Sequence, residues 1–133
     1  MFTPGATYSY CNSGYVLLGR IIEVIDGQSW DESLRERLTG PLAATQTVTL
    51  PEEAILRRAA VGHQRCGTPV QVWGLPRSIG PAGLITATPG DLLTFARLLL
   101  DGGITADGKR LLSEAAVTAI EERDGVRFYV EPG

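Results

Sequence analysis

Apolar residues recur every three or four positions along several stretches of the chain, and this spacing places them on one face of an α-helix. The sequence therefore predicts four main helices, over Ser13–Asp26, Trp30–Leu38, Pro89–Asp101 and Glu114–Arg123. The first stretch is apolar at so many positions that we expect a helix buried on most sides. A short further helix is predicted from Pro51, because proline suits the first helical position and Glu52 and Glu53 favour the helix dipole.

The residues that flank these stretches are typical of helix ends. Asn12 or Ser13 can cap the first helix, and Gly27 can end it in a left-handed conformation. Ser29 and Glu32 can form a capping box, in which each side chain satisfies a backbone amide of the other residue. Further start and stop signals are Gly40-Pro41, Thr88-Pro89, Gly102-Gly103 and Ser113. The inner face of the last helix is predicted to consist of Ala116, Val117 and Ile120.

Extended structure is predicted only in short pieces. Val70–Trp73 alternates apolar and polar side chains, as a half-buried strand does. Asp107-Gly108 is typical of a turn at the tip of a hairpin. Val126–Val130 has the pattern of a strand but no obvious partner strand in this chain. The predicted fold class is therefore α+β and predominantly α.

Composition limits the functions open to the chain. It has 133 residues, of which 44% are hydrophobic, and a formal net charge of -3. This profile indicates a globular domain and argues against a nucleic-acid partner, which normally requires a basic patch. No apolar run approaches the roughly 20 residues of a membrane span, and no signal peptide is visible. We therefore expect neither nucleic acid nor a membrane among its partners.

The chain contains two cysteines and one histidine. Cys11, Cys66 and His63 cannot build a four-ligand zinc site without carboxylates, so we expect no metal and no cofactor. The two cysteines could pair, but we expect free, part-buried thiols. A nucleophilic pair of His63 with either cysteine is conceivable, although nothing in the local sequence supports it.

A Tyr-x-Asn element lies directly before the first apolar helix, in the segment Tyr8-Ser9-Tyr10-Cys11-Asn12-Ser13-Gly14-Tyr15. It resembles the Tyr-x-Asn element of class C β-lactamases, DD-peptidases and related esterases, in which the middle residue is usually Ser and here is Cys11. Three further segments resemble that family in the same order. They are Leu18–Gly27, Pro41-Leu42 with Thr47, and Pro81-Ala82-Gly83 with Thr88, Asp91-Leu92, Phe95 and Leu99–Gly103. Ala43, Ala44 and Leu84 stand where the family pattern has Gly, Met and Gly.

The resemblance implies a serine hydrolase that works by acyl transfer. In that family a Ser-x-x-Lys helix supplies the nucleophile, and a Lys-Thr-Gly or His-Thr-Gly strand completes the pocket. By motif position, Tyr10 is implied as the proton-transfer residue and Asn12 as the amide that orients the lysine and the substrate carbonyl. The implied substrate of the parent enzyme is a small acyl compound, namely a β-lactam, a D-alanyl peptide or an ester.

The two other motifs of the family do not occur in this sequence. No serine has Lys three residues later, and the single lysine, Lys109, is followed by Arg110. His63 is followed by Gln64 and not by Thr-Gly. We therefore expect residues 1–133 to form a single partial domain, the helical part of a β-lactamase/transpeptidase-like fold that lacks most of the sheet. We expect it to be inactive alone.

Each of these residues also has a simpler interpretation. Tyr10 could be a packed aromatic residue, and Asn12 could be only a helix cap. Asp91 is most simply a first-turn carboxylate that faces the helix dipole, and Trp30 and Trp73 are most simply packing residues. For the whole chain, the alternative is a non-catalytic helical module that binds a partner supplying the missing sheet. Exposed apolar helix surface would also favour self-association.

Overall fold

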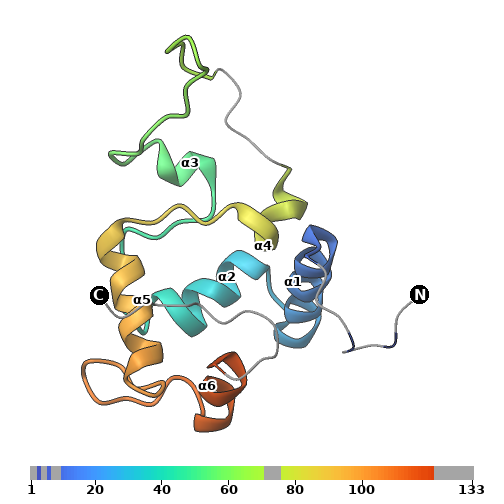
Figure 1. Cartoon of the computed structure of the whole chain (residues 1–133), viewed down its shortest axis with the longest axis vertical. Helices are drawn as coiled ribbons and strands as arrows, with labels where there is room; N and C mark the ends of the chain where they lie inside the picture. Colours follow the sequence, from blue (N-terminus) through green and yellow to red (C-terminus); the bar gives the residue numbers. More distant parts are fainter. Residues whose placement is uncertain (1–2, 4–5, 7–9, 71–75, 122–133) are drawn as a thin grey trace. The chain divides into compact units, whose positions relative to one another are not determined.

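The computed structural model describes residues 3, 6, 10–70 and 76–121. Its helices are α1 (Asn12–Asp26), α2 (Trp30–Leu34), α3 (Pro51–Ala54), α4 (Gly80–Gly83), α5 (Pro89–Leu100) and α6 (Glu114–Glu121) (Figure 1). A π-helical turn over Arg35–Thr39 continues α2, and a 3-10 turn over Arg77–Ile79 precedes α4. Extended pairing in the described part amounts to isolated antiparallel bridges, without a sheet. The predominantly helical fold predicted from the sequence is confirmed.

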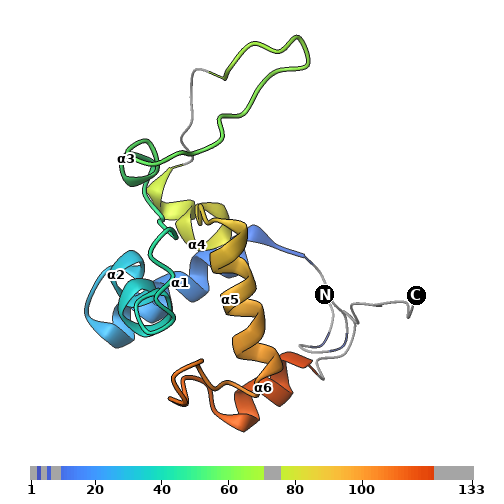
Figure 2. The ribbon, with the colours of Figure 1, turned by 90° about the vertical axis from the view of Figure 1, so that its left-hand side faces the viewer.

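The chain divides into two compact units, which are described separately. The larger unit consists of Cys11–Leu92, and the smaller consists of Met1–Tyr10 together with Leu93–Gly133. Helix α5 begins in the larger unit and continues into the smaller one. Within the smaller unit, α5 leads through a loop into α6 (Figure 2).

Helix α1 begins earlier than its capping residues predict. Cys11 is the N-cap, with an extended backbone (φ -151°) and no hydrogen bond from its side chain to the first turn. Asn12 already lies inside the helix, so the prediction that Asn12 or Ser13 caps it is wrong. At the other end Gly27 has φ 68° and donates its amide to the Glu23 carbonyl at 2.9 Å. The predicted left-handed end of α1 is confirmed.

The burial expected for α1 is also wrong. Gly19 is the only residue of α1 that is buried. The large apolar side chains that remain exposed are Tyr15, Leu17, Leu18, Ile21, Ile22, Val24 and Ile25. The described residues of the larger unit pack on α1 through α2 and α4. They leave its other face open, and this explains why the apolar pattern overstates the burial.

Helix α2 starts as predicted. The Ser29 hydroxyl accepts a hydrogen bond from the Glu32 amide at 3.3 Å, and the Ser29 amide donates to the Glu32 carboxylate at 3.0 Å. Together α2 and the following π-helical turn cover the residues predicted as one helix. The Trp30 ring packs against Gly80 of α4, which supports its interpretation as a packing residue.

The segment that follows α2 and helix α3 supply the apolar core of the larger unit. Its buried apolar side chains are Leu42, Ala44, Val48 and Ala54. Val48 and Thr86 exchange backbone hydrogen bonds of 2.9 and 2.8 Å, so this segment pairs with the chain that enters α5. Helix α3 has Pro51 in its first turn with Glu52 and Glu53 beside it, as predicted.

The smaller unit is built from α5, a hairpin-like loop and α6. Gly102 and Gly103 end α5 with φ of 63° and 84°, and Gly108 forms the predicted turn with φ 83°. The Ser113 hydroxyl accepts from the Ala116 amide at 3.1 Å and so caps α6 as predicted. Val117 is buried, but Ile120 is 56% exposed, so its placement on the inner face is wrong. The predicted strands Val70–Trp73 and Val126–Val130 and the predicted helix end at Arg123 extend outside the described residues.

Candidate functional site

The Tyr-x-Asn element lies at the start of α1. The Tyr10 side chain is 65% exposed, and Asn12 is the first residue of the helix and also exposed. Tyr10 belongs to the smaller unit and Asn12 to the larger one, so each is described by itself. Both residues are therefore accessible at the surface of the described chain. The interpretation of Asn12 as the N-cap does not hold, because Cys11 occupies that position.

Cys11, between the two, has an unusual electrostatic position. The polar groups of Gly14 and Ser13 favour its thiolate form and hold the pKa of the thiol below its usual value. Cys11 and Cys66 are both free thiols, and both are exposed rather than part-buried as expected. His63 lies in a different segment, where it pairs with Pro69 in an isolated bridge.

A close contact with α4 holds α1 in position. Any Cβ atom added at Gly19 would overlap the Pro81 ring, since it would lie 2.7 Å from Pro81 Cβ and still nearer to Cγ. Glycine is thus required for α1 and α4 to approach this closely. The Pro-Ala-Gly segment, found as a motif in the sequence, therefore supports the helix that begins at Asn12.

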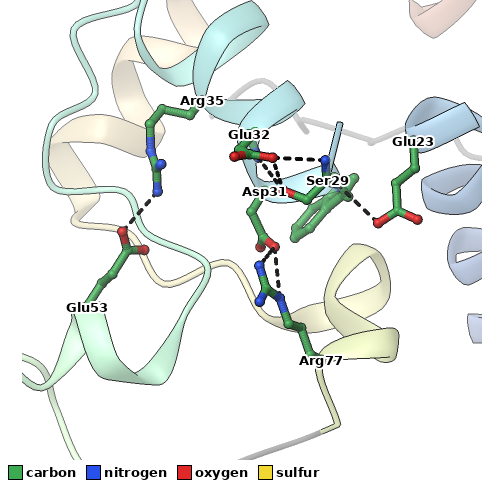
Figure 3. Close-up of polar contacts among 8 residues, drawn as sticks. Glu23, Ser29, Asp31, Glu32, Arg35, Glu53 and Arg77 are labelled. Carbon is green, nitrogen blue, oxygen red and sulfur yellow. Dashed lines mark hydrogen bonds and ion pairs between the residues drawn. The ribbon is translucent and has the colours of Figure 1, made fainter. Parts of the chain in front are cut away.

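A polar network anchors α2 to the turn before α4. Both Nε and one terminal nitrogen of Arg77 donate to Oδ2 of Asp31, at 3.2 and 2.8 Å (Figure 3). Burial acts to raise the pKa of Asp31, but hydrogen bonds from Thr49 and Arg77 outweigh it and hold the pKa below its ordinary value. Asp31 is buried and Arg77 is exposed, so the network fixes the carboxylate while the guanidinium faces solvent.

The same network reaches α1 and α3. The Trp30 amide donates to Glu23 of α1 at 3.3 Å, and Arg35 donates to Glu53 of α3 at 2.9 Å (Figure 3). These contacts tie α1, α2, α3 and the turn before α4 into one framework. Each carboxylate of the framework accepts at least one hydrogen bond from the protein, although the buried Oε2 of Glu53 has no hydrogen-bond partner among the described residues.

A second clip joins the turn after α2 to the start of α5. Oδ2 of Asp91 accepts hydrogen bonds from the Thr47 hydroxyl at 2.8 Å and the Gln46 amide at 2.9 Å. Asp91 was expected only to face the helix dipole, and the structure shows that it also fixes this turn. Thr47 and Asp91 belong to two of the segments that carried the family resemblance.

The described residues contain neither a cluster of metal ligands nor a helix that could span a membrane. Among them, no cluster of three or more His, Cys, Asp or Glu side chains is arranged to hold a metal ion. None of the helices in ranges 10–70 and 76–121 is long and apolar enough to cross a membrane.

An open groove of about 320 Å³ lies between α1 and α2, and its walls include Ile22, Ile25, Leu34 and Leu38. Its walls are mostly apolar and also include Asp26, Ser33 and Arg37.

Comparison with known proteins identifies the scaffold. The sequence profile of the β-lactamase family matches residues 1–129. The chain belongs to the β-lactamase family. Penicillin-binding protein 4 of Amycolatopsis lactamdurans is 47% identical over 125 residues, which cover 90% of this chain and 33% of that protein. The family resemblance seen in the sequence is therefore confirmed.

Solved structures of the family agree with this assignment. The octameric penicillin-binding protein homologue from Pyrococcus abyssi matches 91% of this chain at 25% identity, with a TM-score of 0.71, over 26% of its own length. The D-amino acid amidase from Ochrobactrum anthropi matches 88% of this chain at 28% identity, with a TM-score of 0.70, over 33% of its own length. The chain thus spans about a third of the length of its relatives and corresponds to a helical part of the family fold.

Proposed function

We propose that this chain is the helical section of a serine hydrolase that works by acyl transfer, with Tyr10 as its proton-transfer residue and Asn12 as its orienting amide. The observation that carries the proposal is the exposed Tyr-x-Asn element at the start of α1, within a chain that belongs to the β-lactamase family. A tyrosine in this role carries a proton between the serine nucleophile, its neighbouring amine and the leaving group.

The proposed substrates are β-lactams, D-alanyl peptides or small esters. One relative is named as a penicillin-binding protein and another as a D-amino acid amidase. In a penicillin and in an amino acid amide alike, the carbonyl carbon bonded to nitrogen is the atom that a serine would attack. These names support acyl substrates of that class for the enzyme to which this section corresponds.

We further propose that residues 1–133 alone do not catalyse the reaction. Acyl transfer by this route needs a nucleophile and an amine that activates it, and the sequence contains no Ser-x-x-Lys. Loss of the nucleophile alone from a serine hydrolase costs on the order of 10⁶ in rate. The proton-transfer role that the motif position assigns to Tyr10 also needs the lysine of Ser-x-x-Lys, which this sequence does not contain.

The experiment is hydrolysis of nitrocefin and of p-nitrophenyl esters by the purified chain, with Tyr10→Phe as the matched variant. We expect both proteins to match the uncatalysed rate. Turnover that disappears in the Phe variant would show a working site in this chain and would overturn the proposed inactivity.

The alternative is a non-catalytic helical module that binds a partner supplying the sheet. The exposed apolar face of α1 favours it, because such a face is typical of a binding surface. The DNA that flanks the coding sequence separates the two. Nearby Ser-x-x-Lys and Lys- or His-Thr-Gly codons support the hydrolase, and their absence supports the module.

A further inference from the structure

Residues 62–70 form a hairpin between α3 and the turn before α4, and we call this hairpin the arm. A backbone hydrogen bond of 2.9 Å joins its two ends, and the Gln64 amide donates to the Thr68 carbonyl, also at 2.9 Å. At the tip, Gly67 has φ 82° and donates its amide to the Gln64 carbonyl at 2.8 Å. The arm is thus a short antiparallel ladder that ends in a tight turn over residues 64–67.

The arm is exposed along its length. Residues 62–69 are all exposed, and Val70 is half-buried. A Cβ atom added at Gly62 would lie 3.3 Å from the Val70 side chain, so this apolar neighbour belongs to the arm itself. An isolated two-stranded hairpin is only marginally stable in water. We therefore expect the arm to open locally while the helices of the larger unit remain folded.

The tip of the arm presents an arginine to solvent. Arg65 and Cys66 are both exposed and precede Gly67 in the turn. Exposed loop tips are preferred sites of proteolytic cleavage. A trypsin-like protease has a carboxylate in its specificity pocket, and it therefore selects a peptide bond that follows Arg or Lys. The Arg65–Cys66 bond meets both requirements.

Most other basic residues of the described chain lie in backbone that is held by the fold. Those within helical segments are Arg20, Arg35, Arg37, Arg77 and Arg97. Lys109 and Arg110 lie in the loop before α6, where the buried Thr105 donates its amide to the Lys109 carbonyl at 2.8 Å. The Arg110 side chain donates to the Gly102 carbonyl at 2.9 Å. A protease would have to unfold these segments to bind them.

Arg57 and Arg58 follow α3 and lie outside the arm. The Arg57 side chain donates to the Thr45 carbonyl at 2.7 Å. The bond after Arg58 leads to Ala59, which is half-buried and donates its amide to the Arg57 carbonyl at 2.9 Å. These contacts hold the stretch against the turn after α2, so the tip of the arm is the favoured position for cleavage.

We propose that the arm is a processing site at which a trypsin-like endopeptidase hydrolyses the Arg65–Cys66 bond. The carbon–nitrogen bond between the two residues breaks, and water supplies a hydroxyl group to the Arg65 carbonyl carbon and a proton to the Cys66 nitrogen. The products are a carboxylate at Arg65 and a free amine at Cys66. The site needs neither Tyr10 nor Asn12, so it is independent of the proposed function.

The two pieces should stay together after cleavage. Contacts within the larger unit join residues that lie before the cleaved bond to residues that lie after it. They are Gly19 with Pro81, Asp31 with Arg77, Thr47 with Asp91, and Val48 with Thr86. Each of these contacts lies outside the arm, so hydrolysis leaves it intact. We therefore expect residues 1–65 and 66–133 to remain associated in one folded protein.

The experiment is limited digestion of the purified chain with trypsin, followed by intact-mass measurement under denaturing conditions and size-exclusion chromatography under native conditions. Among the described residues, we expect the first cut after Arg65. The two pieces should elute together at the volume of the uncut chain, and the helical circular dichroism should be retained. A first cut after another described Arg or after Lys109, or pieces that separate, would overturn the inference.

Two variants and one chemical probe assign the cut. Arg65→Gln should reduce the rate of cleavage in the arm at least tenfold, whereas Arg58→Gln, the matched control, should leave that rate unchanged. A 2-cyanobenzothiazole reagent condenses with an N-terminal cysteine, so it should label the piece that begins at Cys66 and leave the uncut chain unlabelled. Equal cleavage of Arg65→Gln and the wild type, or a cut chain that the reagent does not label, would contradict the proposed site.

The urea dependence of cleavage separates local opening of the arm from global unfolding. Local opening exposes little additional surface, so the cleavage rate should change less than about twofold at urea concentrations below the unfolding transition. A short unfolded peptide substrate corrects for the effect of urea on trypsin itself. A rate that rises steeply with urea, in parallel with global unfolding, would show that the folded protein protects the arm and would overturn the inference.

Discussion

Thr47 donates its hydroxyl to Oδ2 of Asp91 at 2.8 Å, although 44 positions separate the two residues in the chain. The Gln46 amide donates to the same oxygen at 2.9 Å. Asp91 also donates its own amide to the Thr88 hydroxyl at 3.2 Å, so it takes part in the cap of α5. One carboxylate thereby connects the start of α5 to the turn after α2.

Removal of this carboxylate should destabilise the larger unit. Asp91→Ala leaves the Thr47 hydroxyl and the Gln46 amide without their acceptor, and we expect a loss of about 1–3 kcal/mol in the free energy of unfolding. Asp91→Asn keeps one acceptor oxygen and should lose less. Urea unfolding measures both. Equal stability of Asp91→Ala and the wild type would show that the clip contributes nothing.

Two glycines of α1 should respond to alanine in opposite directions. Gly19→Ala places a methyl group in the Pro81 ring and should cost about 1–3 kcal/mol of stability. Gly14 has nothing within 4 Å of an added Cβ, so Gly14→Ala should stabilise the helix by about 0.5 kcal/mol. Thermal denaturation of both variants checks this. A stabilised Gly19→Ala protein would mean that α4 does not pack on α1.

Ala43 occupies a left-handed conformation, with φ 51°, at the position where the family turn has Gly. A side chain there is strained, so Ala43→Gly should stabilise the protein by about 0.5–1 kcal/mol. Ala44 is buried and does not have a positive φ. Ala44→Gly should therefore destabilise the protein. Chemical denaturation compares the two, and a loss of stability in Ala43→Gly would refute the assignment of strain to this turn.

The Asp31–Arg77 pair predicts a pH dependence. The folded protein holds the pKa of Asp31 below its ordinary value of 3.8, so its stabilisation is present above that value and is lost as the pH falls from there through the lowered pKa of the folded state. We therefore expect Asp31→Asn to show a smaller loss of stability than the wild type as the pH falls below about 4. Arg77→Ala should lower the stability at neutral pH, because it removes two hydrogen bonds from the buried Asp31 carboxylate.

The control for this pair is Asp101→Asn, which removes a charge of the same sign from the smaller unit. It should keep the acid sensitivity of the wild type. Identical pH profiles for the wild type and Asp31→Asn, measured by urea unfolding at each pH, would contradict the role given to the pair.

Local signals in the sequence predict most of the helices. The capping box at Ser29, Pro51 in the first turn of α3 and the left-handed Gly27 each act within a few residues, so the sequence alone reveals them. The N-cap of α1 was misplaced because Asn12 and Ser13 have strong capping preferences, yet the chain enters the helix one residue earlier. The turn and helix before α5 were missed because they contain few residues.

Contacts between distant segments could not be predicted in this way. Nothing in the periodicity relates Asp31 to Arg77, or Thr47 to Asp91, because such pairs depend on how the helices pack. The apolar pattern of α1 signals a surface that avoids water, but not what covers it. For the candidate site, the motif supplied Tyr10 and Asn12, and their catalytic roles remain predictions.

The central claim is that this chain carries the helical section of an acyl-transfer enzyme without its nucleophile. Intact-mass spectrometry of the purified chain after incubation with a labelled penicillin tests it most directly, because acyl transfer to a serine attaches the label covalently until the acyl group is hydrolysed. We predict an unmodified mass for the wild type and for Tyr10→Phe alike. A stoichiometric adduct on the wild-type chain would contradict the account.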